Sequence, residues 1–183
     1  MSLRGDRQVW TVGGALASSA ALLAGAVCAQ SADPACEQLE TVLSQRDSGF
    51  SELQATPLQS PNQAVISTLL FLDSTDCKIR SSISSSEAGT YSCEWTMTGK
   101  AIAQRKFLAL RDMVKSCRSD LVVNDEAVDP NEPVMLFITT SADTYIAIGL
   151  LSEGESSGSV RYRVGIDILS AQGFANWKAL SGE

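Results

Sequence analysis

The side chains of this sequence that could do chemistry are mainly carboxylates, because the chain contains no histidine. That absence excludes Ser-His-Asp and Cys-His nucleophile systems and histidine-ligated zinc sites. The densest group of carboxylates comprises Asp125, Glu126 and Asp129, with Glu132 close by. Oxygen ligands of this kind could coordinate calcium, or could supply the acid and base of a glycosidase. The group lacks the alternating acidic positions and the turn glycine of a calcium loop, so a solvated loop is the simpler interpretation and no cofactor is predicted.

Hydroxyl and phosphate chemistry have weak support in the sequence. Serines are concentrated in residues 81–86, but no Ser-x-x-Lys occurs that would place a lysine base on the same helix face. Gly154 and Gly158 lie in a Ser/Glu-rich segment without the lysine of a phosphate-binding loop.

Four of the five cysteines lie after residue 29, at positions 36, 77, 93 and 117. An even number in an exported chain predicts disulfides. If residues 84–86 form a tight connection, the strands on either side place Cys77 opposite Cys93 and Ile79 opposite Tyr91. Cys36 and Cys117 then pair by elimination. A redox-active pair is the alternative, but the chain has no Cys-x-x-Cys motif.

Positive charge is concentrated on one predicted helix. Lys100, Arg111, Lys115 and Arg118 fall within a narrow arc of it, and a solvated face is the alternative interpretation of this arc. The candidate interaction surface consists of these four residues together with two from the last predicted strand: Lys100, Arg111, Lys115, Arg118, Arg161 and Arg163. The whole chain has a net charge of −7, which argues against nucleic acid and anionic membranes as partners.

The N-terminus resembles an export signal. Arg4 and Arg7 precede an uncharged apolar run over 9–27, and Val27-Cys28-Ala29 fits a cleavage site. We therefore predict a signal peptide over residues 1–29, a single domain over 30–183, and a periplasmic or secreted protein without stable membrane anchoring after cleavage. An uncleaved anchor is the alternative, although the Ala, Gly and Ser content makes this run a weak membrane span. Lipidation of Cys28 fits less well, because Ala26-Val27 is a poor match to the small residues needed before a lipidated cysteine.

The central elements are a strand over 91–97 and the helix that follows it. Tyr91, Cys93, Trp95 and Met97 alternate onto one face of the strand, which is typical of a half-buried strand and makes Trp95 a core residue. The helix is predicted to start after Thr98 as its N-cap and to end near Arg118. Its apolar stripe comprises Ala103, Phe107, Leu110, Val114 and Cys117.

The remaining pattern predicts another helix and further strands. Asp33-Pro34 is a helix start, and that helix should run to about Asp47. Strands are predicted over 64–72, 77–83, 134–140, 144–151 and 160–168, with an irregular crossing at 119–131 that could contain one short strand at 121–123. In the last strand, Arg161, Arg163 and Asp167 should face outward. The fold class expected is α+β: a single antiparallel sheet of five to six strands with two long helices packed on one face, in the order α-β-β-(β)-α-β-β-β, with two disulfides.

These features favour a non-enzymatic binding module that contacts another protein through an exposed sheet face or the basic helix. Two alternatives remain open: a carboxylate-dependent hydrolase acting on cell-envelope glycans, and a small calcium-stabilised structural domain.

Overall fold

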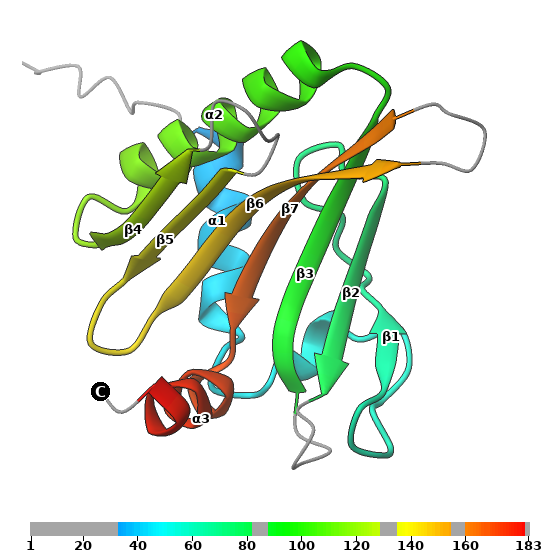
Figure 1. Cartoon of the computed structure of the whole chain (residues 1–183). Helices are drawn as coiled ribbons and strands as arrows, with labels where there is room; N and C mark the ends of the chain where they lie inside the picture. The colour runs from blue at the N-terminus through cyan, green and yellow to red at the C-terminus, as the bar shows by residue number, and fades with distance from the viewer. Residues whose placement is uncertain (1–32, 82–87, 129–134, 155–159, 182–183) are drawn as a thin grey trace, which may run out of the picture. The chain divides into compact units, whose positions relative to one another are not determined.

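The computed structural model describes residues 33–81, 88–128, 135–154 and 160–181, which belong to one compact α+β unit (Figure 1). In chain order its elements are α1 (Pro34–Ser44), a short 3₁₀ helix η1 (Ser51–Leu53), β1 (Ala64–Ile66), β2 (Asp76–Ser81), β3 (Ala88–Met97), α2 (Lys100–Cys117), β4 (Val122–Val128), β5 (Met135–Thr140), β6 (Tyr145–Gly154), β7 (Val160–Leu169) and α3 (Ala171–Ser181). The predicted signal segment and the connection at 84–86 lie outside the described residues.

All strands join one antiparallel sheet in the order β1-β2-β3-β7-β6-β5-β4. The α+β class, the single antiparallel sheet and the two disulfides agree with the sequence analysis. The expected number of strands was too low, since the sheet has seven rather than five to six. The helix count also differs, because the C-terminal residues form α3.

Two strands account for the errors in strand prediction. β4 is a seven-residue strand through Asp125 and Glu126, where an irregular crossing with one short strand at most was expected. Acidic residues have a low strand propensity, so the sequence did not indicate a strand here. The strand forms because its backbone pairs with β5. β1 covers only Ala64–Ile66 instead of 64–72. After it the chain leaves the sheet, and Phe71 is fully buried in the core.

The core lies between one face of the sheet and the layer formed by α1 and α2 (Figure 1). The predicted stripe of α2 is confirmed, since Ala103, Phe107, Leu110 and Val114 are all buried. Thr98 is not its cap, because the helix begins at Lys100 with Gly99 in the N-cap position and no side-chain cap.

Helix α1 begins where Asp33 accepts a hydrogen bond from the backbone N–H of Ala35 at 2.9 Å. It ends at Ser44 rather than near Asp47, because residues 45–50 form turns in which Gly49 and Phe50 both have positive φ. This reversal places the Phe50 side chain in the core with no exposed surface.

Both disulfides form as the sequence analysis predicted. Cys36 and Cys117 join the start of α1 to the end of α2, with 5.2 Å between their Cα atoms. Cys77 and Cys93 lie opposite each other in β2 and β3, with Ile79 opposite Tyr91. Tyr91, Cys93 and Trp95 are buried on the inner face of β3, as expected.

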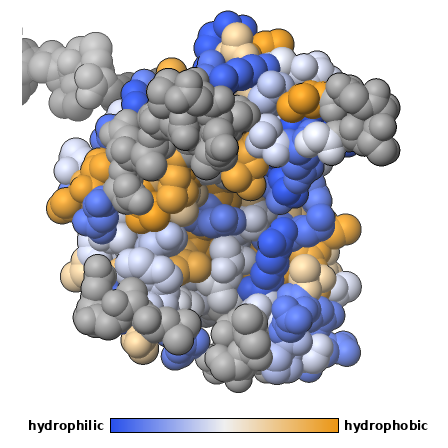
Figure 2. Space-filling view, in the orientation of Figure 1, coloured by the Kyte–Doolittle hydropathy of each residue, from blue (hydrophilic) through white to orange (hydrophobic). Residues whose placement is uncertain are grey.

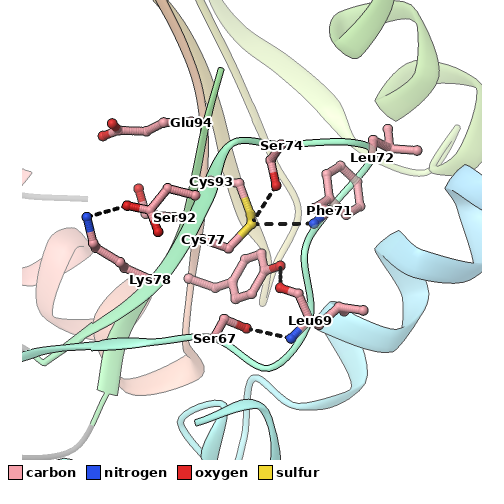
Figure 3. Close-up of a disulfide and its surroundings, with 12 residues drawn as sticks. Ser67, Leu69, Phe71, Leu72, Ser74, Cys77, Lys78, Ser92, Cys93 and Glu94 are labelled. Carbon is pink, nitrogen blue, oxygen red and sulfur yellow. Dashed lines mark hydrogen bonds and ion pairs between the residues drawn. A yellow bond between two sulfur atoms is a disulfide. The ribbon is translucent and has the colours of Figure 1, made fainter. Parts of the chain in front are cut away.

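The segment 67–75 crosses beside the Cys77–Cys93 disulfide (Figure 3). Cys77 Sγ lies 3.4 Å from the Phe71 backbone nitrogen and 3.0 Å from Ser74 Oγ. The Tyr91 hydroxyl donates to the Leu69 carbonyl at 2.9 Å, and burial raises the pKa of Tyr91 to about 12. Buried polar groups of β2 and β3 therefore find their partners in this crossing segment.

The crossing reverses direction at Leu72 and Asp73, which have φ values of 43° and 55°. This left-handed conformation is unfavourable for residues other than glycine. Contacts from two other elements hold it: Trp95 Nε1 donates to the Leu72 carbonyl at 3.0 Å, and Lys106 Nζ donates to Asp73 Oδ1 at 2.8 Å.

Helix α3 packs across the end of β3. A Cβ built on Gly173 would lie 2.4 Å from the Gly89 carbonyl oxygen, so only glycine permits this close approach. Phe174 is buried there and belongs to an aromatic group with Tyr145 and Trp177.

Candidate functional site

The sheet has an inner face, which packs on α1 and α2, and an outer face on the opposite side. Alternation along each strand decides which residues reach the outer face. On β7 these are Arg161, Arg163, Gly165, Asp167 and Leu169, between the buried Val164, Ile166 and Ile168. The expectation that Arg161, Arg163 and Asp167 face away from the core agrees with this pattern.

A hollow of about 260 Å³ lies in the outer face across β2, β3, β7 and β6. Its ionisable residues are Arg80, Glu94, Arg163 and Asp167. The Glu94 carboxylate lies between two guanidinium groups, 3.7 Å from Arg80 Nη2 and 3.5 Å from Arg163 Nη1. These separations are longer than a normal hydrogen bond, so both contacts are loose ion pairs. Arg163 also pairs with Glu153 of β6.

Asp167 is the most perturbed carboxylate of this hollow. Burial raises its pKa, and the negative charge of Glu94 acts in the same direction. The hydrogen bond from Ser92 Oγ to Asp167 Oδ1, at 2.5 Å, and the positive charge of Arg80 oppose the increase. As a whole the residue is nevertheless exposed to solvent. Its carboxylate is therefore accessible to a ligand, although its immediate surroundings disfavour the charged form.

Two glycines form the floor of the hollow. Gly149 of β6 and Gly165 of β7 lie opposite each other in the sheet. A Cβ at Gly149 would meet nothing within 4 Å, and one at Gly165 would meet only the Cys93 carbonyl oxygen, at 3.6 Å. The hollow exists because these two positions lack side chains.

A second hollow, also of about 260 Å³, adjoins the first toward α3. Arg80 and Asp167 line both hollows, and we call the two neighbouring hollows together the trough. The wall of its far end includes Tyr145 and Trp177, whose ring centroids are 4.9 Å apart at an interplanar angle of 51°.

Beyond the trough, toward β4, the outer face carries several exposed or partly exposed aliphatic side chains. Val122 of β4 has 64% of its surface exposed and Leu151 of β6 has 47%, and between them Leu136 and Ile138 of β5 are partly exposed. We call these four residues the apolar half. Figure 2 shows the change across the sheet, with hydrophobic residues gathered over β4 and β5 and hydrophilic ones over β2 and β3.

The acidic candidates from the sequence are not gathered into a loop. Asp125 and Glu126 occupy consecutive positions of β4, paired with Ile138 and Phe137, and Asp129 lies outside the described residues. Within the described ranges, no three Cys, Asp or Glu residues converge on a point where they could hold a metal ion.

The structure divides the six predicted cationic residues between two layers. Arg161 and Arg163 lie on the outer face of β7, whereas Lys100, Arg111, Lys115 and Arg118 belong to α2, which packs on the inner face.

Several charges of the α2 group have partners within the chain. Arg111 pairs with Asp112 at 2.8 Å, and Arg118 binds both carboxylate oxygens of Asp120 at 2.8 Å. Lys115 Nζ lies 5.2 Å from the centre of the Phe137 ring. The basic arc of α2 is thus partly neutralised by its own chain, which favours the outer face as the place for a partner.

Sequence reasoning missed Arg80, Ser92, Glu94 and Trp177 as members of a site. The predicted pairing of Cys77 with Cys93 already implies that Arg80 and Ser92 face the opposite side of the sheet from the disulfide. Their meeting with Asp167 depends on β3 pairing with β7, two strands separated along the chain by α2 and three other strands. No local pattern signals that pairing.

Comparison of the chain with protein-family models, curated proteins and solved structures found no match. Over the described residues, no helix is both long and apolar enough to cross a membrane.

Proposed function

We propose that this chain is an exported binding module without catalytic activity, and that it contacts another protein through the apolar half of the outer face. The two disulfides fit an exported protein, because such bonds persist in oxidising compartments. What we propose is that the partner is a protein and that the apolar half contacts it.

The observation that carries this proposal is the exposure of Val122 and Leu151 on a sheet face that α1 and α2 do not cover. Burying such side chains in an interface is favourable, at about 25 cal/mol per Å² of apolar surface. Aliphatic residues gathered beside a sheet edge are typical of a protein contact. In the described part of the chain, β4 is the last strand of the sheet and pairs only with β5, so a partner strand could also extend the sheet there.

Retention of envelope proteins on the immobilised chain tests this proposal. Val122→Glu places a charge within the proposed contact, and Arg105→Glu provides a control at an exposed position of α2. A specific protein should be retained by the wild type and the control and lost with Val122→Glu. Equal retention by all three, or none by the wild type, would exclude the apolar half as the contact.

A second candidate function is a carboxylate-dependent hydrolase acting on cell-envelope glycans. The observation that favours it is that Glu94 and Asp167 line the same hollow and that the pKa of Asp167 is raised, as suits a general acid. The wild type would then release reducing ends from envelope glycans and Asp167→Asn would not. Absence of release by the wild type rejects the hydrolase.

A further inference from the structure

The trough differs in chemistry from the apolar half, and its occupant can be argued separately. The β7 residues that line it run from Arg163 to Leu169 on one side of the strand. The six residue-to-residue steps from Arg163 to Leu169 cover about 20 Å at roughly 3.3 Å per step. The depression is therefore elongated and suits a ligand of several linked units.

The charges lining the trough are balanced. Arg80 and Arg163 face Glu94 and Asp167, and the only ion pairs among these four are the long ones to Glu94. Within the described residues, the Arg80 guanidinium makes no hydrogen bond, and Asp167 accepts one, from Ser92. Hydrogen-bond donors and acceptors are thus available side by side.

This balance selects against a charged ligand. An anion would be attracted to the two arginines but repelled by the two carboxylates. A cation would be attracted to the carboxylates but repelled by the arginines. Either would have to compete with the existing ion pairs of Glu94. A neutral ligand whose groups both donate and accept, as hydroxyl groups do, can bind all four residues and leave their pairing intact.

The aromatic end of the trough adds a second requirement. Tyr145 and Trp177 line the trough next to Arg80 and Asp167, and both are partly exposed. Aromatic rings have electron-rich faces on which C–H groups pack well. A pyranose ring combines such C–H groups on its faces with hydroxyl groups around its edge, so it meets both requirements within one unit.

We propose that the trough is a binding site for a neutral oligosaccharide, with sugar rings packed against Tyr145 and Trp177 and hydroxyl groups bound by Arg80, Glu94 and Asp167. This goes beyond the proposed protein contact: of the four residues of the apolar half, Leu151 also lines the trough, whereas Val122, Leu136 and Ile138 do not. It concerns binding and involves no bond cleavage.

The test is titration of the full-length protein with uncharged di- to tetrasaccharides of glucose, mannose, galactose or N-acetylglucosamine, followed through the tryptophan indole N–H signals in NMR spectra. Trp95 is an internal control, because it is buried on the inner face and its N–H is bonded to Leu72. We expect at least one saccharide to shift the Trp177 signal in a saturable way and leave the Trp95 signal in place.

Binding by substituted proteins then tests whether the saccharide lies in the trough. Arg80→Gln and Asp167→Asn should each weaken binding about tenfold or more, since each removes charge-assisted hydrogen bonds. Arg105→Gln and Val122→Glu should leave it unchanged. The proposal is overturned if no uncharged saccharide shifts Trp177, if the trough variants bind as well as the wild type, or if only charged saccharides or peptides bind. None of these outcomes alters the Val122-dependent retention that tests the protein contact.

Discussion

At the scale of single residues, two aspartates show how the environment moves a pKa in opposite directions. Asp143, beside the turn between β5 and β6, is held by Ser141, Thr144 and Arg46, and these contacts lower its pKa to about 2. Asp167, in the trough, has its pKa raised mainly by burial. The first arrangement favours the charged carboxylate in the folded protein, and the second disfavours it at an exposed residue that a ligand can reach.

Asp143 should make stability depend on pH in the acid range. Its folded pKa is lower than its ordinary value of 3.8, so its contribution is complete above about pH 4 and is lost as the pH falls toward 2. Thermal unfolding between pH 5 and 2 should therefore show a smaller acid-induced loss in Asp143→Asn than in the wild type. Asp47→Asn, at an exposed site near the end of α1, controls for the loss of one negative charge. Identical pH profiles for Asp143→Asn and wild type would contradict the assignment.

For Asp167 we expect the opposite dependence of stability on pH. Because its folded pKa is raised, ionisation of this carboxylate costs stability at neutral pH, and the cost disappears once the pH falls below the ordinary pKa. Asp167→Asn keeps an acceptor for Ser92 and removes the charge, so it should unfold at a higher denaturant concentration than wild type at pH 7. The difference should shrink at pH 3. A variant less stable than wild type at pH 7 would show that attraction to Arg80 outweighs burial.

The orientation of Asp167 could be predicted from the sequence, but its neighbours in the trough could not. Alternation in the last strand correctly placed Asp167 away from the core. Its bond to Ser92 and its proximity to Arg80 and Glu94 require the β3–β7 and β2–β3 pairings together. Only the second of these joins neighbouring strands of the chain, so only the second could be derived from a local pattern.

At the scale of elements, local signals predicted helices better than strands. The stripe of α2 and the Asp33-Pro34 start of α1 are encoded by residues close in sequence, and both are present. Strand lengths were wrong at β1 and β4. In β1, the need to bury Phe71 and to supply partners for Tyr91 and Trp95 shortens the strand. In β4, pairing with β5 extends it through acidic residues. Both effects come from distant parts of the chain.

The N-cap of α1 provides a test at this scale. Asp33 satisfies the Ala35 N–H, so Asp33→Ala should destabilise the protein by about 1 kcal/mol, whereas Asp33→Ser should retain most of the stability. Denaturant unfolding of the two variants beside wild type measures this difference. Equal stability of the Ala and Ser variants would show that the cap contributes nothing.

At the scale of the whole molecule, one disulfide cross-links the helix layer and the other cross-links the sheet. Cys36–Cys117 joins α1 to α2 across 81 residues of sequence, and Cys77–Cys93 joins the neighbouring strands β2 and β3 across 16 residues. The chain-entropy model assigns about 4.5 kcal/mol to the longer loop and about 3 kcal/mol to the shorter one.

The two contributions can be separated with Cys36→Ala/Cys117→Ala and Cys77→Ala/Cys93→Ala, each of which retains one disulfide. Comparing each variant in its oxidised and reduced forms isolates the remaining bond, because the side chains stay otherwise the same. Reduction should cost more where Cys36–Cys117 remains. A larger loss where Cys77–Cys93 remains would mean that the strand disulfide supports more of the fold than its loop length predicts.

The central claim is that the outer face, at its apolar half, contacts another protein. The most direct measurement is cross-linking in living cells from a photoreactive amino acid placed at position 122 of β4, with the same group at position 105 of α2 as the control. We predict one defined cross-linked protein species from position 122 and none from position 105. No species from position 122, or the same species from both positions, would contradict the claim.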